Sequence, residues 1–220
     1  MERRLAAILI SDVVNYTKLL EEDTESTVAA WSQARDQIIE PIILKVDGRI
    51  VKFTGDGFLS EFNTVQTALE CAIEIQNNLS DNPLKFRMAI NMGDIIDDGR
   101  DIHGEGINIA ARLESIAEPG GICISGDVFN QVRNRIKAEY EDLGPQEVKN
   151  VSNPVQAYMV RVEDKALGKT LVDGDDKENL SIAVLPFDNM SADPDQEFFT
   201  DGIVEDIITE LSFLKNIKVI

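Results

Sequence analysis

Histidine is almost absent from this sequence, whose 220 residues contain a single one, His103. With one imidazole, zinc sites built mainly from histidine are excluded, and a Ser-His-Asp triad would depend on that one residue. If the chain is an enzyme, its chemistry must therefore rest mainly on carboxylates, lysine and arginine.

Cysteine is nearly as scarce. The two cysteines, Cys71 and Cys123, each lie in an apolar run, LECAIEI and GICIS. Buried free thiols are typical of proteins in a reducing compartment, where disulfides rarely persist. The sequence therefore predicts two buried, unpaired thiols and a cytoplasmic location, with a disulfide or a catalytic thiol as the less favoured alternatives.

Positive charge and long hydrophobic runs are also lacking. The chain has 21 lysines and arginines against 40 aspartates and glutamates, a net charge of -19. Nucleic acids and anionic membranes are bound by basic faces, so we expect neither as a partner. The apolar run at residues 5–14 is interrupted by Asp12, and no run approaches the ~20 residues of a membrane span. We expect no signal peptide and no direct membrane insertion.

The first 162 residues do contain a regular alternation of strand and helix patterns. Pro41 should kink the first long helix, and Gly48 should end it. The order of elements, βαββαβ with additions, predicts an α/β (α+β) fold of the ferredoxin-like sandwich type. The predicted strands are 5–14, the hairpin 51–62, 84–97, 122–125, 137–144 and 155–162, and the predicted helices are 23–48, 64–82, 104–121 and 126–136.

Beyond residue 162 the periodicity breaks. Residues 163–179 are polar and acidic, which predicts a linker between domains. Residues 180–220 then read as a strand, a helix at 201–214 and the start of a second strand. Such an incomplete βαβ unit leaves a sheet edge uncovered. We therefore expect the natural chain to be longer, with further C-terminal domains.

The stretch VKFTGDGFLSEF predicts a tight hairpin with Asp56 at its apex, because glycine supplies the positive φ that a two-residue turn needs. Asp12 ends the first predicted strand. In a βαββ sheet these two strands are commonly neighbours, so the two carboxylates can converge. Converging carboxylates repel each other unless a divalent ion such as Mg²⁺ binds them. The structural alternative is that Asp12 caps a helix and Asp56 only fills the turn.

The stretch DIHGEGINIAARLES carries a second candidate group. Asn108 and Arg112 are four residues apart and share one helix face. A fixed amide donor beside a permanently charged guanidinium suits the binding of a phosphate or another oxyanion. The structural alternative is a surface ion pair of Arg112 with Glu105 or Glu114.

Taken together, AAILISDVVNYT, TGDG with a lysine before it and DIHGEGINIAARLE resemble the class III nucleotidyl cyclases over about residues 3–162. The resemblance implies that Asp12 and Asp56 bind two Mg²⁺ or Mn²⁺ with help from the backbone carbonyl of Val13. It also implies that Asn108 orients the ribose and that Arg112 stabilises the charge of the transition state. The identity of the general base stays open between a metal-bound hydroxide, Asp12 and the substrate.

The resemblance further implies that Lys52 and Asp101 read the purine. Lysine can donate to adenine N1 and aspartate can accept from N6, so the pair favours ATP. Residues Asn15, Tyr16 and Thr17 follow the first strand, where backbone N–H groups and the Thr17 hydroxyl can bind phosphates. Asn15 stands where the family often has glycine, and asparagine tolerates the left-handed conformation.

We therefore expect an adenylate cyclase that converts ATP to 3′,5′-cyclic AMP and pyrophosphate at a homodimer interface. Asp12 and Asp56 of one chain would face Lys52, Asp101, Asn108 and Arg112 of a second copy. The alternatives are a guanylate cyclase, a diguanylate-cyclase or polymerase-palm enzyme, and a non-catalytic nucleotide sensor. Residues 180–220 resemble the start of the TolB-like domains that follow cyclase domains in some bacterial proteins.

Overall fold

The computed structural model describes residues 2–148, 151, 153–161, 180–182 and 217–219. The chain divides into two compact units, Met1–Gly168 and Lys169–Ile220. The expected linker at 163–179 and the expected helix at 201–214 lie outside the described residues.

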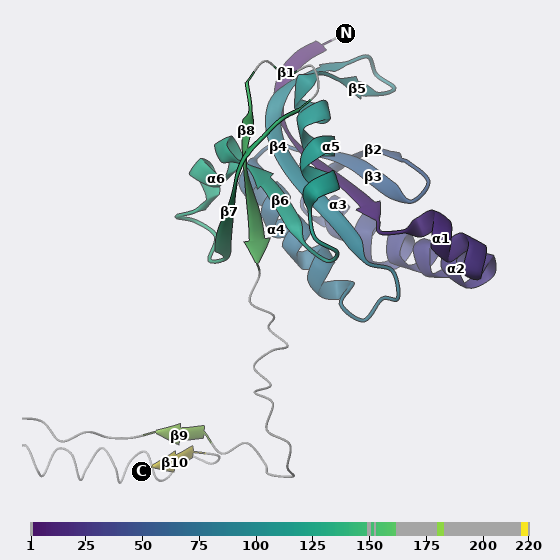
Figure 1. The fold of residues 1–220 in the computed structure, drawn as a ribbon, viewed down its shortest axis with the longest axis vertical. Coiled ribbons are helices and arrows are strands. Elements are labelled where there is room, and N and C mark those ends of the chain that lie inside the picture. Colours follow the sequence, from purple (N-terminus) through teal and green to yellow (C-terminus); the bar gives the residue numbers. More distant parts are fainter. Residues whose placement is uncertain (1, 149–150, 152, 162–179, 183–216, 220) are drawn as a thin grey trace, which may run out of the picture. The chain divides into compact units, whose positions relative to one another are not determined.

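A mixed eight-stranded sheet organises the first unit (Figure 1). The strand order is β2-β3-β1-β4-β6-β8-β7, with β5 paired to β4, and β4 and β6 form the parallel pair. Six further pairings are antiparallel, which confirms the predicted α+β class. The strands are β1 Glu2–Val13, β2 Arg49–Phe53, β3 Gly57–Phe62, β4 Phe86–Asp97, β5 Ile102–His103, β6 Ile122–Ser125, β7 Glu139–Gln146 and β8 Val155–Arg161.

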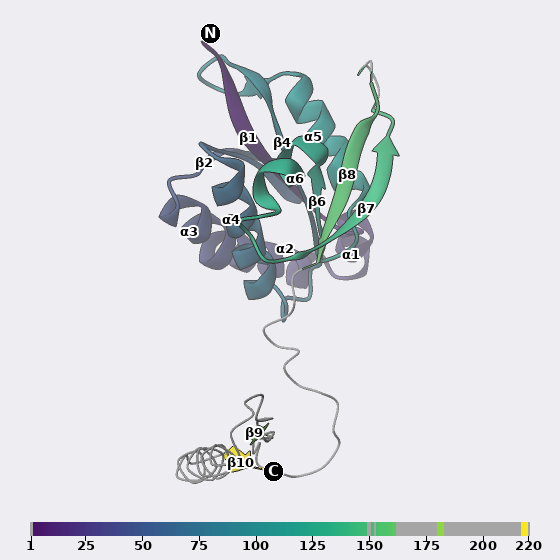
Figure 2. The same ribbon diagram turned by 90° about the vertical axis from the view of Figure 1, so that its left-hand side faces the viewer.

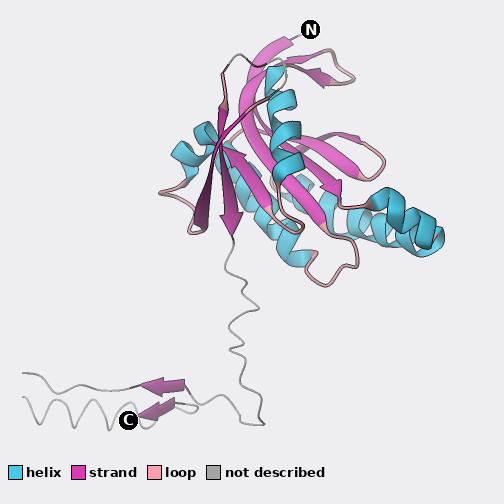
Figure 3. Cartoon of the chain, in the orientation of Figure 1, coloured by secondary structure: helices cyan, strands magenta, loops and turns pink. Residues whose placement is uncertain are grey.

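Helices cover both faces of this sheet (Figures 2 and 3). Because side chains alternate along a strand, Leu9 and Val13 of β1 enter one core while Ala6 and Ile8 enter another. The first core is covered by α2, α3, α4 and α6, and the second by α5. The helices are α1 Tyr16–Glu22, α2 Thr24–Ala34, the π-helical η1 Arg35–Ile39, α3 Glu40–Lys45, α4 Val65–Asn78, α5 Glu105–Ile116 and α6 Gly126–Val132.

The long helix expected at 23–48 is present as one continuous helical run of α2, η1 and α3, which begins at Thr24 and ends at Lys45. Asp23 caps α2, its carboxylate accepting from Ser26 N at 3.0 Å. The disturbance expected at Pro41 takes the form of the π-helical segment η1. Pro41 has no N–H to donate to the carbonyl four residues before it, which weakens the regular α-helical pattern here. The N–H of Glu40 donates to Arg35 O, five residues back, which is the π-helical spacing.

Helix α5 is seated directly on β4. The buried side chain of Asn91 donates to Gly106 O at 2.9 Å, which fixes the first turn of the helix. Gly93 and Gly106 lie in contact, since a Cβ on Gly93 would stand 2.9 Å from Gly106 Cα. This close seating determines where the following residues of α5 stand.

The second unit contains β9 Leu180–Ile182 and β10 Ile217–Val219, which pair in parallel. Parallel pairing is what the two ends of a βαβ unit require. In the first unit Cys71 and Cys123 are free and buried, as expected, and burial raises the pKa of each thiol to about 12. Among the described residues, no helix is long and apolar enough to cross a membrane.

Candidate active site

The β2–β3 hairpin has the predicted two-residue turn, Gly55–Asp56, closed by a hydrogen bond from Thr54 N to Gly57 O at 2.9 Å. Gly55 adopts φ +96°, which other residues rarely tolerate. Gly57 is required for a different reason, because a Cβ there would lie 2.0 Å from the carbonyl oxygen of Ser11. The two glycines therefore let the hairpin turn tightly and lie against β1, which positions Asp56.

Asp12 and Asp56 meet at the end of β1. Asp12 is opposite Gly57 in the β1–β3 register, and Val13 N donates to Asp56 O at 3.0 Å. Burial and the neighbouring charge of Asp56 raise the pKa of Asp12. The expected convergence of the two carboxylates is therefore present. The alternative that Asp12 caps a helix is wrong, because the residue at the N-cap of α1 is Asn15.

Two charged side chains that sequence reasoning missed complete this end of the sheet. Arg87 is directly opposite Asp12 in the β1–β4 register, and its Nη2 donates to Asp12 Oδ2 at 3.0 Å. Arg87 Nε lies 3.0 Å from Oε1 of Glu114 on α5. We call Asp12, Asp56, Arg87 and Glu114 the carboxylate group.

The carboxylate group has more negative than positive charge. Burial raises the pKa of Glu114 to about 7, an effect that Arg87 opposes and that Asp12 and Asp56 reinforce. One guanidinium therefore faces three carboxyl groups in a partly buried site. Such a site is electrostatically unfavourable until a cation enters it.

The donor set fits a hard divalent cation. Carboxylate oxygens are preferred ligands of Mg²⁺, which commonly binds through one or two carboxylates plus substrate phosphates. Within the described residues, no cluster of three or more acidic, histidine or cysteine side chains has metal-binding geometry. Asp12 and Asp56 therefore match a cation shared with a phosphate ligand better than a cage built entirely from protein. The part of the Val13 carbonyl as a ligand stays a prediction.

Lys52 and Asp101 form a second, separate pair. Lys52 Nζ donates to Asp101 Oδ2, so residues from β2 and from the turn before β5 come together. That hydrogen bond lowers the pKa of Asp101. The expected neighbourhood of a lysine donor and an aspartate acceptor is thus present within one chain, and its reading of a purine stays a prediction.

Asn108 and Arg112 stand exposed on the outer side of α5. Within the described part of the chain the guanidinium of Arg112 has no hydrogen-bond or ion-pair partner, and the backbone carbonyl of Arg112 accepts from Ser115 Oγ at 2.7 Å. The alternative surface pair with Glu114 is wrong, because Glu114 is buried and paired with Arg87. We call Asn108, Arg112 and the Lys52–Asp101 pair the outer group.

The turn that leads out of β1 has the expected backbone conformation. Asn15 adopts φ 58° and ψ 29°, the left-handed region that asparagine tolerates. Asn15 and Thr17 are exposed and Tyr16 is half-buried at the start of α1. Contacts of these three residues with phosphate stay a prediction.

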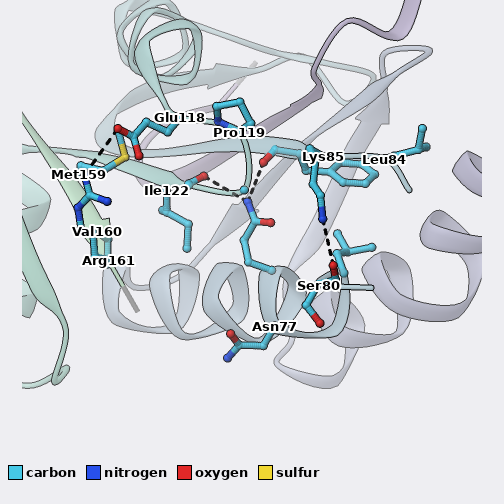
Figure 4. Close-up of a pocket in the computed structure, with 15 residues that line it drawn as sticks. Asn77, Ser80, Leu84, Lys85, Glu118, Pro119, Ile122, Met159, Val160 and Arg161 are labelled. Atoms are coloured by element: carbon cyan, nitrogen blue, oxygen red, sulfur yellow. Dashed lines mark hydrogen bonds and ion pairs between the residues drawn. The ribbon is translucent and has the colours of Figure 1, made fainter. Parts of the chain in front are cut away.

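A cavity of about 470 Å³ lies elsewhere, beside the C-terminal end of α4 (Figure 4). Its charged side chains already have partners: Lys85 Nζ donates to Ser80 O at 3.0 Å, and Arg161 lies 3.6 Å from Glu118. None of the predicted site residues lines it. The candidate site is therefore the end of β1 and the outer side of α5, not this cavity.

Known proteins resemble the chain in both sequence and fold. Residues 2–162 match the family model described as the adenylate and guanylate cyclase catalytic domain. A Rhizobium meliloti protein named "Putative adenylate cyclase 3" is 40% identical over 232 residues, an alignment that covers 100% of this chain. The chain spans 40% of the length of that relative.

Two crystal structures extend the similarity to the fold. An adenylate/guanylate cyclase/hydrolase from Silicibacter pomeroyi is 40% identical with a TM-score of 0.69, covering 74% of this chain and 99% of its own. The adenylyl cyclase CyaB from P. aeruginosa is 26% identical with a TM-score of 0.65, covering 75% of this chain and 98% of its own.

Proposed function

Because the chain belongs to the adenylate and guanylate cyclase catalytic domain family, we propose that it is an adenylate cyclase that converts ATP to 3′,5′-cyclic AMP and pyrophosphate. The observation that carries the proposal is the meeting of Asp12 and Asp56 at the end of β1. The Lys52–Asp101 pair supports adenine as the base, since it presents one donor and one acceptor. The names of two similar proteins, from Rhizobium meliloti and P. aeruginosa, point the same way.

In this reaction the ribose 3′-hydroxyl attacks the α-phosphorus and pyrophosphate leaves. Two Mg²⁺ or Mn²⁺ held by Asp12 and Asp56 would neutralise phosphate charge and activate the attacking hydroxyl. The contribution of the chain itself is mainly positioning and electrostatic stabilisation, as in other phosphoryl transfers. Asn108 would hold the ribose, and Arg112 would stabilise the charge that develops at phosphorus. Arg87 lies beside Asp12 and would contact phosphates bound through a metal ion on Asp12.

We assign each site to two chains. The carboxylate group interacts within its own chain, whereas Asn108 and Arg112 face outward. A twofold dimer would place the outer group of one copy against the carboxylate group of the other and create two equivalent sites. Outward-facing donors without side-chain partners among the described residues support this arrangement.

Incubation of the purified chain with Mn²⁺–ATP or Mn²⁺–GTP tests the activity and its two rivals. We expect cyclic AMP from ATP and little cyclic GMP from GTP. A preference for GTP would establish a guanylate cyclase. Binding of ATP without turnover at any Mn²⁺ concentration would establish a nucleotide sensor.

For the C-terminal part, residues 163–179 are proposed as a linker and 180–220 as the start of a TolB-like domain. Parallel pairing of β9 with β10 supports the βαβ interpretation. Deletion of all residues after 162 should then leave a folded, active cyclase domain, because few contacts cross a linker. An insoluble or unfolded truncation would mean that the C-terminal segment completes the cyclase core.

A further inference from the structure

Helix α5 presents functional side chains on two opposite sides. Arg112 is exposed, and Glu114, two residues later, is 9% exposed and turned toward its own sheet. Two residues correspond to about 200° around an α-helix, so these side chains cannot serve the same space. The outward side belongs to the proposed contact with a second chain, and the inward side contacts Arg87 of the same chain.

The guanidinium of Arg87 is shared unequally between two carboxylates. Its Nη2 makes an aligned hydrogen bond to Asp12 at 3.0 Å. Its Nε is equally close to Glu114 Oε1, at 3.0 Å, but the two buried atoms lack hydrogen-bond alignment. A buried donor and acceptor left unaligned are costly, so a small rotation of Arg87 toward Glu114 is favoured once Asp12 no longer holds it.

Binding of a metal ion at Asp12 would release Arg87 from Asp12. A cation on Asp12 replaces the positive charge that Arg87 provides in this structure. Arg87 then keeps Glu114 as its carboxylate partner, and Glu114 makes no other ion pair among the described residues. The freed Nη2 end lies beside Asp12, and the proposed function puts the metal-bound phosphates of the nucleotide next to Asp12.

We propose that Glu114 is a positioning residue: it anchors Nε of Arg87 while the other end of the guanidinium exchanges Asp12 for the nucleotide's phosphate chain. The inference rests on the proposed function. In the proposed dimer, each α5 then serves both sites, with Arg112 in the partner's site and Glu114 in its own.

The first test is equilibrium binding of Mn²⁺–pyrophosphate by titration calorimetry, a readout independent of turnover. Glu114→Ala and Arg87→Ala should each weaken binding about tenfold, the lower end of the effect of removing a supporting partner. Because Glu114 acts through Arg87, the double variant should bind no more weakly than Arg87→Ala alone. Glu105→Ala, on the exposed first turn of the same helix, should bind like wild type.

Additive losses in the double variant, or wild-type binding by Glu114→Ala, would overturn the proposal. If Glu114→Ala does not fold, the near-isosteric Glu114→Gln decides. It should weaken binding in the wild-type background and have no effect in the Arg87→Ala background. Equal weakening in both backgrounds would show that Glu114 acts independently of Arg87.

The second test asks which site Glu114 serves, using mixed dimers assayed for cyclic AMP. Glu114→Ala mixed with Arg112→Ala should reach roughly a quarter of wild-type activity above the residual activity of the Glu114→Ala sites, because both lesions fall in one site of the mixed dimer and the other site stays intact. Glu114→Ala mixed with Asp12→Ala should recover none beyond residual activity. If Glu114→Ala merely distorted α5, it would also displace Arg112 of its own chain, and the first mixture would fail.

A reference mixture of Asp12→Ala with Arg112→Ala tests the shared site separately from the role of Glu114. If this reference restores no activity, the shared site is wrong, and the calorimetric cycle alone decides the role of Glu114. If the reference recovers and the Glu114→Ala mixture with Arg112→Ala does not, the positioning role is wrong and the shared site stands.

Discussion

The carboxylate group and the outer group differ in how far one chain satisfies them. In the carboxylate group, Arg87 is bonded to Asp12 and paired with Glu114, and Asp56 adjoins Asp12, all within one chain. In the outer group, Lys52 and Asp101 bind each other, whereas Arg112 projects into solvent.

This difference shows what each group lacks. The carboxylate group has surplus negative charge and needs cations, and the outer group offers an amide and a guanidinium that need an anion. A metal–nucleotide complex supplies both, provided that the groups face each other. We propose that the two groups face each other between two copies of the chain, so that each copy completes the other's site.

The largest effect is expected from removing a metal ligand. Asp12→Ala or Asp56→Ala should lower turnover by about 10³-fold or more, because a charge-stabilising element of the transition state is lost. The fold should survive, since each change removes a carboxylate from a crowded negative site. Cyclic AMP formation at saturating Mn²⁺, together with circular dichroism, measures both.

Asp81→Ala, at an exposed aspartate that is not part of the carboxylate group, serves as the matched control and should keep full activity. Near-native turnover by either Asp12→Ala or Asp56→Ala would contradict the assignment of the metal ligands.

A smaller effect is expected from the Lys52–Asp101 pair. Lys52→Glu combined with Asp101→Ser should lower the ratio of ATP to GTP turnover at least about tenfold, because glutamate accepts from guanine N1–H and N2–H where lysine cannot. The kcat/KM values for the two nucleotides measure this. Lys137→Glu, an exposed lysine elsewhere, should leave the ratio unchanged. An unchanged ratio in the double variant would show that this pair does not read the base.

The smallest effect concerns stability and pH. The folded-state pKa of Glu114 is raised from 4.5 to about 7, so its protonated form stabilises the fold. That stabilisation is complete below pH 4.5 and is lost as the pH rises through 7. In the presence of a chelator, the free energy of unfolding of Glu114→Gln at pH 8 should therefore exceed that of wild type by on the order of 1–3 kcal/mol. The variant should accordingly unfold at a higher temperature, and the difference should shrink toward pH 5.

Thermal unfolding from pH 5 to pH 8 tests this, with Glu105→Gln as the control that should show no such gap. A gap that is constant with pH, or that favours wild type at pH 8, would contradict the raised pKa. The expected gain in stability contrasts with the weaker phosphate binding expected of the same variant.

Much of the fold and part of the site could be predicted from local sequence. The periodic spacing of apolar residues predicted the order of strands and helices, and the TGDG stretch predicted the turn that presents Asp56. Asn15 was expected to tolerate the left-handed conformation and adopts it. The π-helical segment before Pro41 was missed, because proline signals a disturbance without specifying its form.

Arg87 and Glu114 were missed for a different reason. Arg87 contacts a residue 75 positions away, and the β1–β4 register that aligns them is not encoded in any local pattern. Glu114 carried a readable signal, since it is four residues after buried Ala110 and three before buried Ala117, on the apolar side of α5. A glutamate in that stripe predicts a buried cationic partner.

The mixture of Asp12→Ala and Arg112→Ala chains tests the central claim most directly. Each homodimer should be inactive, because every site in it lacks one essential group. After subunit exchange, about half of the dimers are heterodimers in which one site collects both lesions and the other collects neither. We expect recovery of roughly a quarter of wild-type cyclic AMP formation. No recovery, with exchange of subunits confirmed by differently tagged chains, would place the entire site within one chain and contradict the account.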